Sequence, residues 1–171
     1  MFSWMIWRNS ATGYAADMMV TPLLILAAAV GTFSGPGWVH AAIIGFVLWQ
    51  PFEWVMHRHI LHGRLIRQHW RHHREPLGEA GVPPFFTIPL LLLLLAVCLL
   101  IPAGGGLWCG YATGYWTYNL THWAIHAGYW PRRGFLGGIA RRHDLHHRGV
   151  AANFNVLLPL CDLCFGTYKR S

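Results

Sequence analysis

Four apolar runs occupy much of this chain, at residues 18–34, 38–56, 85–101 and 107–125. Each has roughly the 17 to 20 residues that a helix needs to cross the hydrocarbon core of a bilayer. The third run contains Leu90 to Leu95 without interruption and is apolar on every side, as expected of a lipid-exposed helix. The sequence therefore predicts an all-α integral membrane protein with four transmembrane helices.

The charged residues indicate an orientation for these helices. The chain carries 13 Lys and Arg against 6 Asp and Glu, a net charge of +7. If all four runs cross, every basic residue lies on the side that holds both termini and the loop His57 to Pro84, and by the positive-inside rule that side is cytoplasmic. Topology and contact with anionic headgroups thus explain the basic surplus, so we expect the lipid bilayer as a partner and no nucleic acid.

The cytoplasmic segments are predicted to fold together as a helical cap. Each has roughly 30 to 45 residues, too few to bury a core alone. The sequence contains no linker, repeat or low-complexity tract that would separate a second domain. We therefore expect a single membrane domain over residues 1–171, a multi-pass protein with both termini and the cap in the cytoplasm.

Twelve histidines are the second unusual feature, and eleven of them lie at or beyond the cytoplasmic ends of the second and fourth runs. Residues three and four apart share a face of a helix. The histidines within 69–73, those within 122–126 and those within 143–147 can therefore each converge, and such spacings are typical of metal ligands. His40 lies elsewhere and is expected to be an interfacial residue without a metal role.

The number of candidate ligands favours two metal ions. Two or three ligands from each cluster give roughly eight to ten, too many for one ion, whereas a structural zinc site usually closes at four. Imidazole suits Zn, Fe, Cu and Ni, so ligand type alone does not select the metal. Higher coordination with room for an exogenous ligand favours oxygen chemistry at iron, in a dimetal site held by the cytoplasmic cap.

The histidine pattern resembles that of the integral-membrane fatty acid hydroxylase superfamily, which includes fatty acid hydroxylases, sterol desaturases and carotenoid ring hydroxylases. The resemblance runs from about Phe52 to Tyr168 and includes Glu53-Trp54 at its start and Phe165-Gly166-Thr167-Tyr168 at its end. The metal ligands that it implies are His57, His62, His69, His72, His73, His122, His126, His143, His146 and His147.

The histidines cluster in four motifs, termed boxes, within residues 57–62, 69–73, 122–126 and 143–147. At the first of these boxes, the resemblance and helical spacing disagree. His57 and His62 are five residues apart, which places them about 140° apart on an ideal helix. His59 and His62 would share a face by spacing alone, but the family pattern selects His57. Either a break at Gly63 or ligation of different ions by the two histidines would reconcile the two readings.

Polar side chains near the boxes are expected to support the ligands. Glu53, one turn before the first box, is expected to hold an imidazole N–H, and Asp144 and Asp162 are candidates for the same task. Asn119 stands where family members often carry Asp, and we expect it to support the site. Asn155 stands where they often carry Gly, and it could keep a turn with positive φ. No catalytic residue is expected beyond the metal centre.

The function that the resemblance implies is O2-dependent hydroxylation of a C–H bond in a membrane lipid, either fatty acyl, sterol or related. The enzyme would be a di-iron membrane oxidoreductase that uses two Fe ions and O2, although isolated protein could carry Zn instead. Because the sequence holds no flavin, nicotinamide or haem motif, electrons would come from an external donor of ferredoxin or cytochrome b5 type.

Several alternatives stay open at this point. The last third of the chain is similar to fatty acid hydroxylases and sterol desaturases, whereas the seven-residue step from His62 to His69 is similar to carotenoid ring hydroxylases. A lipid or sterol desaturase is the closest alternative, because it begins with the same hydrogen abstraction. A divalent-metal transporter would place its ligands near mid-bilayer, whereas these histidines cluster at one face. A membrane protein stabilised by structural zinc is the third alternative.

Overall fold

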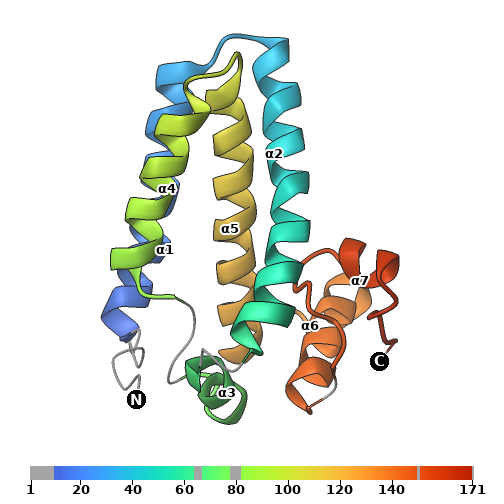
Figure 1. The fold of residues 1–171 in the computed structure, drawn as a ribbon. Coiled ribbons are helices and arrows are strands. Elements are labelled where there is room, and N and C mark those ends of the chain that lie inside the picture. Colours follow the sequence, from blue (N-terminus) through green and yellow to red (C-terminus); the bar gives the residue numbers. More distant parts are fainter. Residues whose placement is uncertain (1–9, 64–66, 78–81, 150, 171) are drawn as a thin grey trace. The chain divides into compact units, whose positions relative to one another are not determined.

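The computed structural model describes residues 10–63, 67–77, 82–149 and 151–170 (Figure 1). Its elements are α1 (Ala11–Thr32), α2 (Pro36–Val55), the π-helical turn η2 (Met56–Leu61), α3 (Arg67–Arg74), α4 (Pro84–Cys98), α5 (Gly104–His126), α6 (Gly134–His147) and α7 (Leu160–Cys164). Every regular element in the described ranges is helical, which confirms the predicted all-α class.

The chain divides into two compact units. Of the described residues, the first unit, termed the histidine unit, comprises those within Gln50–Ala80 and Tyr118–Ser171, and the second, termed the bundle unit, comprises those within Asn9–Trp49 and Gly81–Thr117. Helices α2 and α5 contribute residues to both units. The single-domain organisation of residues 1–171 stays a prediction.

Glycines on α5 allow α2 to approach it closely within the bundle unit. A Cβ added to Gly110 would lie 1.8 Å from the backbone oxygen of Ala42, and one added to Gly114 would lie 2.5 Å from the Cβ of Trp49. Such contacts require the absence of a side chain, as in the helix pairs of membrane proteins, where small residues let two backbones meet. The glycines in the fourth apolar run therefore serve packing.

Several buried polar side chains of the bundle unit form hydrogen bonds within it. The indole N–H of the fully buried Trp108 donates to the backbone oxygen of Leu91 at 2.7 Å. Buried Asp17 accepts hydrogen bonds from the Tyr115 hydroxyl and, at 2.9 Å, from the Thr21 hydroxyl. Apolar surroundings demand such pairing, because an unpaired polar group in hydrocarbon costs several kcal/mol.

Two helical stretches, Ala11–Thr32 and Pro36–Leu61, are long and apolar enough to cross a membrane. The other two predicted spans are helical as well, but α4 has only 15 residues and α5 mixes Gly, Thr, Asn and His with its apolar residues. Large apolar side chains nevertheless face outward on α4, where Leu93 is 62% exposed and Val97 55%. The part of the chain that the structure describes thus contains two candidate spans, and the count of four stays a prediction.

The histidine unit has little apolar core. One buried cluster consists of Ile125, Ile139, Ala140 and Val156, and another consists of Trp54, Phe154 and Cys161. Much of the remaining buried interior is polar, since five histidines of this unit are at most 3% exposed: His57, His72, His122, His143 and His146. The interior of this unit is therefore built largely around imidazole rings.

Candidate metal centre

The π-helical turn η2 places both histidines of the first box on one side. Hydrogen bonds in a π-helix join residues five apart, and the backbone N–H of His62 donates to the carbonyl of His57 at 3.1 Å. The two ring centroids are 5.2 Å apart. His59 is exposed and stacks edge-on against Trp54. The π-helical turn therefore reconciles the two readings of this box without a break at Gly63, and His57 and His62 belong to the same group of histidines and not to different ones.

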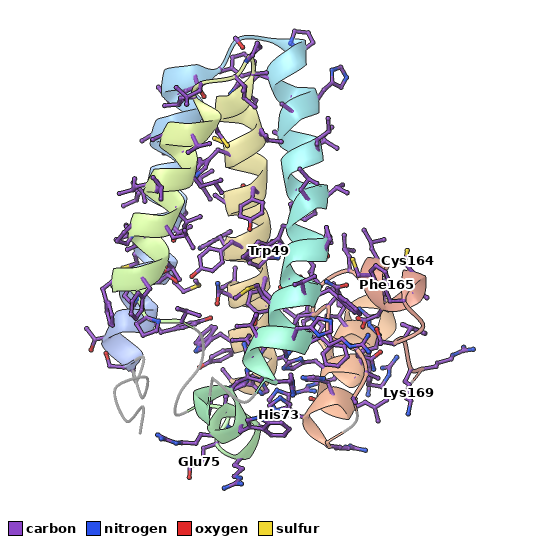
Figure 2. The ribbon with its side chains drawn as sticks, in the orientation of Figure 1. Trp49, His73, Glu75, Cys164, Phe165 and Lys169 are labelled. Carbon is purple, nitrogen blue, oxygen red and sulfur yellow. The ribbon has the colours of Figure 1, made fainter. Side chains whose placement is uncertain are left out.

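Five histidines form the first of two groups, termed group 1. Its members are His57, His62, His69, His73 and His146, and their candidate ligand nitrogens all lie within 4.8 Å of one another. Nε2 of His69 is 3.1 Å from Nε2 of each of His57, His62 and His73. Figure 2 shows the nitrogen-bearing side chains that gather around His73. These nitrogens converge as the ligands of a single ion would.

Five other histidines form group 2. Its members are His72, His122, His126, His143 and His147, and their candidate ligand nitrogens also lie within 4.8 Å of one another. Nε2 of His72 is 2.9 Å from Nε2 of His122, and Nε2 of His143 is 2.9 Å from Nε2 of His126. All ten predicted ligands thus fall into the two groups, while His40 and His59 belong to neither. That the ten bind metal stays a prediction.

The second and last histidine boxes each divide between the two groups. On α3, His69 and His73 join group 1 and His72 joins group 2, while on α6 the neighbours His146 and His147 go to groups 1 and 2. Successive residues on a helix are about 100° apart, so adjacent side chains point in different directions. The expectation that each of these boxes converges as a whole was wrong, because each helix instead supplies both groups.

Three backbone carbonyls determine which ring nitrogen of their histidine carries the proton. The Nδ1 pairs are His57 with Phe154 O (2.6 Å), His146 with Ala152 O (2.8 Å) and His72 with Pro76 O (3.1 Å). A carbonyl oxygen only accepts, so Nδ1–H donates in each pair and Nε2 of the neutral ring keeps its lone pair. These three Nε2 atoms are therefore prepared to bind a cation.

The ring nitrogens that face one another are better placed to bind cations than to form hydrogen bonds between the rings. In group 1, Nε2 of His69 has three Nε2 neighbours but can donate at most one proton. In group 2, Nδ1 of His143 and both ring nitrogens of His147 are buried without a hydrogen-bond partner among the described residues. A buried unpartnered polar group costs about 1–3 kcal/mol, which a bound ion would offset for any nitrogen that ligates it. Ten imidazoles in two groups therefore suit two ions such as Fe or Zn.

Burial keeps these imidazoles neutral. Burial, followed by the neighbouring His73, lowers the pKa of His62 to about 4. Burial, followed by His126, lowers the pKa of His72 to about 3. The pKa of His143 is also well below its ordinary value, with burial again as the main cause. The rings are therefore deprotonated near pH 7, which is the form that binds metal.

Two predicted supporting carboxylates have contacts away from the imidazoles, and the prediction that Glu53 also holds an imidazole N–H stays a prediction. Oε1 of Glu53 accepts a hydrogen bond from the backbone N–H of Val156 at 2.6 Å, so it anchors the backbone segment that carries two of the three carbonyls. Asp144 forms an exposed ion pair with Nη1 of Arg132 at 2.6 Å. The prediction that Asp144 holds an imidazole was therefore wrong, since its carboxylate points to an arginine. Asn119 is buried on α5, one turn before His122 of group 2, and its supporting role stays a prediction.

Sequence reasoning missed the role of the segment Ala152–Val156. The residue with positive φ is Asn153, at 56°, and the expectation of positive φ at Asn155 was wrong. The Asn155 side chain instead bridges two elements, because its Nδ2 donates to Gln50 O at 2.9 Å and its Oδ1 accepts from Cys161 N at 3.1 Å. Two asparagines within an apolar stretch were the available signal that buried backbone needed partners there.

Ten convergent imidazoles on an all-helical fold define a candidate dinuclear metal protein, and comparison with known proteins identifies its family. Residues 42–167 match the family model described as fatty acid hydroxylase. The chain belongs to the fatty acid hydroxylase family, which confirms the resemblance seen in the histidine pattern.

Relatives and one solved structure extend this comparison. The chain is 28% identical to fatty acid 2-hydroxylase of Macaca fascicularis over 142 residues, which cover 73% of this chain and 38% of the relative. It is 26% identical to dihydroceramide fatty acyl 2-hydroxylase FAH1 of Arabidopsis thaliana over 148 residues, 77% of this chain and 62% of that protein. The match therefore spans less than two thirds of either relative.

The fold is similar to a solved chain described as full-length scs7p with only the hydroxylase domain visible. The TM-score is 0.76 at 18% sequence identity, and the match covers 95% of this chain and 67% of that chain. At this identity the similarity concerns the fold alone.

Proposed function

We propose that this protein is an O2-dependent lipid hydroxylase with a di-iron centre held by groups 1 and 2. The observation that carries this proposal is the convergence of ten imidazoles into two groups of five, each within 4.8 Å. Membership of the fatty acid hydroxylase family supports the reaction class. The relatives are named fatty acid and fatty acyl 2-hydroxylases, which favours a fatty acyl chain as the substrate.

Each group would hold one iron. When bound and reduced, the two irons would supply O2 activation and removal of hydrogen from an unactivated C–H bond. The chain itself orients the ligands, since the Nδ1–H bonds of His57, His146 and His72 direct their Nε2 atoms to the ions. Burial of the rings excludes water and keeps them neutral.

A membrane lipid is the substrate that the surroundings of the site favour. Apolar side chains stay exposed on the same helical stretches of the histidine unit that carry the ligands. Phe52 and Val55 are 40% and 46% exposed near the end of α2, and Leu120 and Trp123 are each 36% exposed on α5. Exposed apolar residues beside a buried polar centre suit an acyl chain that enters from the bilayer, so we propose a multi-pass membrane protein.

An external protein would supply the electrons. Among the described residues, the histidine unit exposes five arginines on or beside the helices that carry the ligands: Arg74, Arg132, which pairs with Asp144, Arg133, Arg141 and Arg148. Such a positive surface suits an acidic donor, because complementary charge speeds association and selects the partner. We propose a donor of ferredoxin or cytochrome b5 type.

Product analysis with isotopically labelled O2 tests the reaction. Membranes from cells that express the protein should contain hydroxylated acyl lipids that carry one labelled oxygen, detected by mass spectrometry. Cells that express His146→Ala should lack them, whereas His40→Ala should match the unaltered protein because His40 belongs to neither group. Unlabelled products with a new double bond would show a desaturase, and unchanged lipids under all conditions would contradict the proposal.

Cysteine labelling tests the proposed topology. In a Cys164→Ser background, which removes the exposed native thiol, cysteines introduced at the exposed residues Ser10, Glu75 and Lys169 should react from the cytoplasmic side only. Cysteine at Ser34, between the two candidate spans, should react from the opposite side. Reaction at Glu75 from the side of Ser34 would contradict the cytoplasmic placement of the metal centre.

A further inference from the structure

The ligand His57 is connected to a buried carboxylate through a single peptide group. Its Nδ1–H donates to the carbonyl oxygen of Phe154 at 2.6 Å. The N–H of the same peptide group belongs to Asn155, and it donates to Oδ2 of Asp162 at 2.8 Å. The carboxylate, the peptide and the imidazole thus form one continuous line of hydrogen bonds that ends at Nε2.

Asp162 is held in place for this contact. Its side chain is fully buried, and Oδ1 accepts hydrogen bonds from Phe154 N at 2.9 Å and from the Thr167 hydroxyl at 2.7 Å. The Thr167 oxygen is itself fixed, because the indole N–H of Trp54 donates to it at 3.1 Å. A buried carboxylate with three donors is a rigid negative charge beside the peptide.

The carbonyl of Ala152, which holds His146, is backed differently. The peptide group whose carbonyl accepts from His146 has the N–H of Asn153, which donates to the neutral backbone oxygen of Thr167 at 2.9 Å. The Nδ1 distance is 2.6 Å for His57 and 2.8 Å for His146, in the order of this difference, and it is 3.1 Å for His72. The carboxylate-backed peptide therefore makes the shortest of the three contacts.

We propose that Asp162 is a positioning residue for His57, which acts through the Phe154–Asn155 peptide group and strengthens metal binding in group 1. Hydrogen bonds in a line polarise one another, so a carboxylate on the N–H makes the carbonyl a better acceptor. A stronger acceptor at Nδ1–H fixes the ring and raises the donor strength of Nε2 for an ion. The arrangement corresponds to the carboxylate–histidine–metal pairing of known metal sites, with a peptide inserted between carboxylate and ring.

Cobalt titration of purified, metal-free full-length protein tests this inference, which rests on the metal-binding part of the proposed function. The unaltered protein should bind two equivalents of Co²⁺. Asp162→Asn should weaken one equivalent about 10- to 100-fold and leave the other unchanged, as expected for loss of an outer partner of one ligand. The matched control Asp144→Asn removes a carboxylate that pairs with Arg132 outside both groups, and it should change neither equivalent.

Two further measurements separate positioning from folding. Thermal unfolding of the metal-free proteins should show whether Asp162→Asn is folded, and weakening of both equivalents together would indicate a general structural role and overturn the inference. If this variant does not fold, nitrogen-15 NMR of the zinc-loaded unaltered protein gives the answer. The Nδ1–H signal lost in His57→Ala should lie further downfield than those lost in His146→Ala and His72→Ala.

The possible failures are distinguishable. Two equivalents in the unaltered protein with no change in Asp162→Asn, or an upfield His57 signal, would overturn the role of Asp162 and leave the proposed hydroxylase standing. Fewer than two equivalents in the unaltered protein would overturn both. Neither measurement depends on turnover, so the absence of a hydroxylated product would count against the reaction alone.

Discussion

His57→Ala is expected to lose one of two metal equivalents and all hydroxylation, whereas His59→Ala is expected to keep both. The His57 ring is 1% exposed and its Nε2 lies 3.1 Å from that of His69 in group 1. Its removal opens a ligand position and leaves the buried carbonyl of Phe154 without this donor, at a further cost of about 1–3 kcal/mol. Metal content per protein and labelled hydroxy-lipid yield measure the two effects.

His59 is the matched control because it lies in the same π-helical turn and is exposed against Trp54. Its loss removes one ring contact and no member of either group. The opposite result, with metal and activity kept in His57→Ala and lost in His59→Ala, would show that plain α-helical spacing selects the ligand. It would contradict the assignment of the first box while leaving a dinuclear centre in place.

His146→Ala and His147→Ala are expected each to lose a different metal equivalent and to abolish turnover. The two residues are neighbours on α6, but His146 belongs to group 1 and His147 to group 2. Loss of an outer partner typically lowers metal affinity about 10- to 100-fold, and loss of a direct ligand should lower it further. Cobalt titration of each single variant and of the double variant, which should bind neither ion tightly, measures the division.

His40→Ala is the control for this pair, since His40 is exposed on α2 in the bundle unit and should affect neither metal content nor turnover. The two single variants also test whether the groups are separate sites. If both lost the same equivalent, with the other equivalent retained in the double variant, the last box would serve one ion only. That outcome would contradict the division into group 1 and group 2.

The histidine spacing was a good guide on α5, although it failed to show how the boxes on α3 and α6 divide. On α5, His122 and His126 are four residues apart and both join group 2, as residues on one helical face should. The same rule was misleading at the first box because η2 is a π-helix, in which residues five apart align. Hydrogen-bond register is not encoded in residue spacing, so only the resemblance to a family could select His57 over His59.

The supporting residues were harder to predict for a related reason. Asp144 directly follows His143, whereas Asp162 lies well beyond the last histidine, so proximity in the sequence favoured Asp144. In the structure Asp144 pairs with an exposed arginine, whereas Asp162 is fully buried and holds the backbone of Phe154 and Asn155. Their tasks follow from burial and from partners that only the folded chain brings near.

Local pattern was enough to predict the helical class, the two stretches that the structure supports as candidate spans and the ten candidate ligands of the histidine unit, while the count of four spans stays a prediction. Those properties depend on apolar runs and on the periodicity of single helices, which can be recognised within one continuous stretch of sequence. The division into two groups of five, the proton positions on the rings and the place of Asp162 required the tertiary structure. The carbonyl that orients His57 lies 97 residues away along the chain, and contacts of that range form only when separate helices and loops pack together.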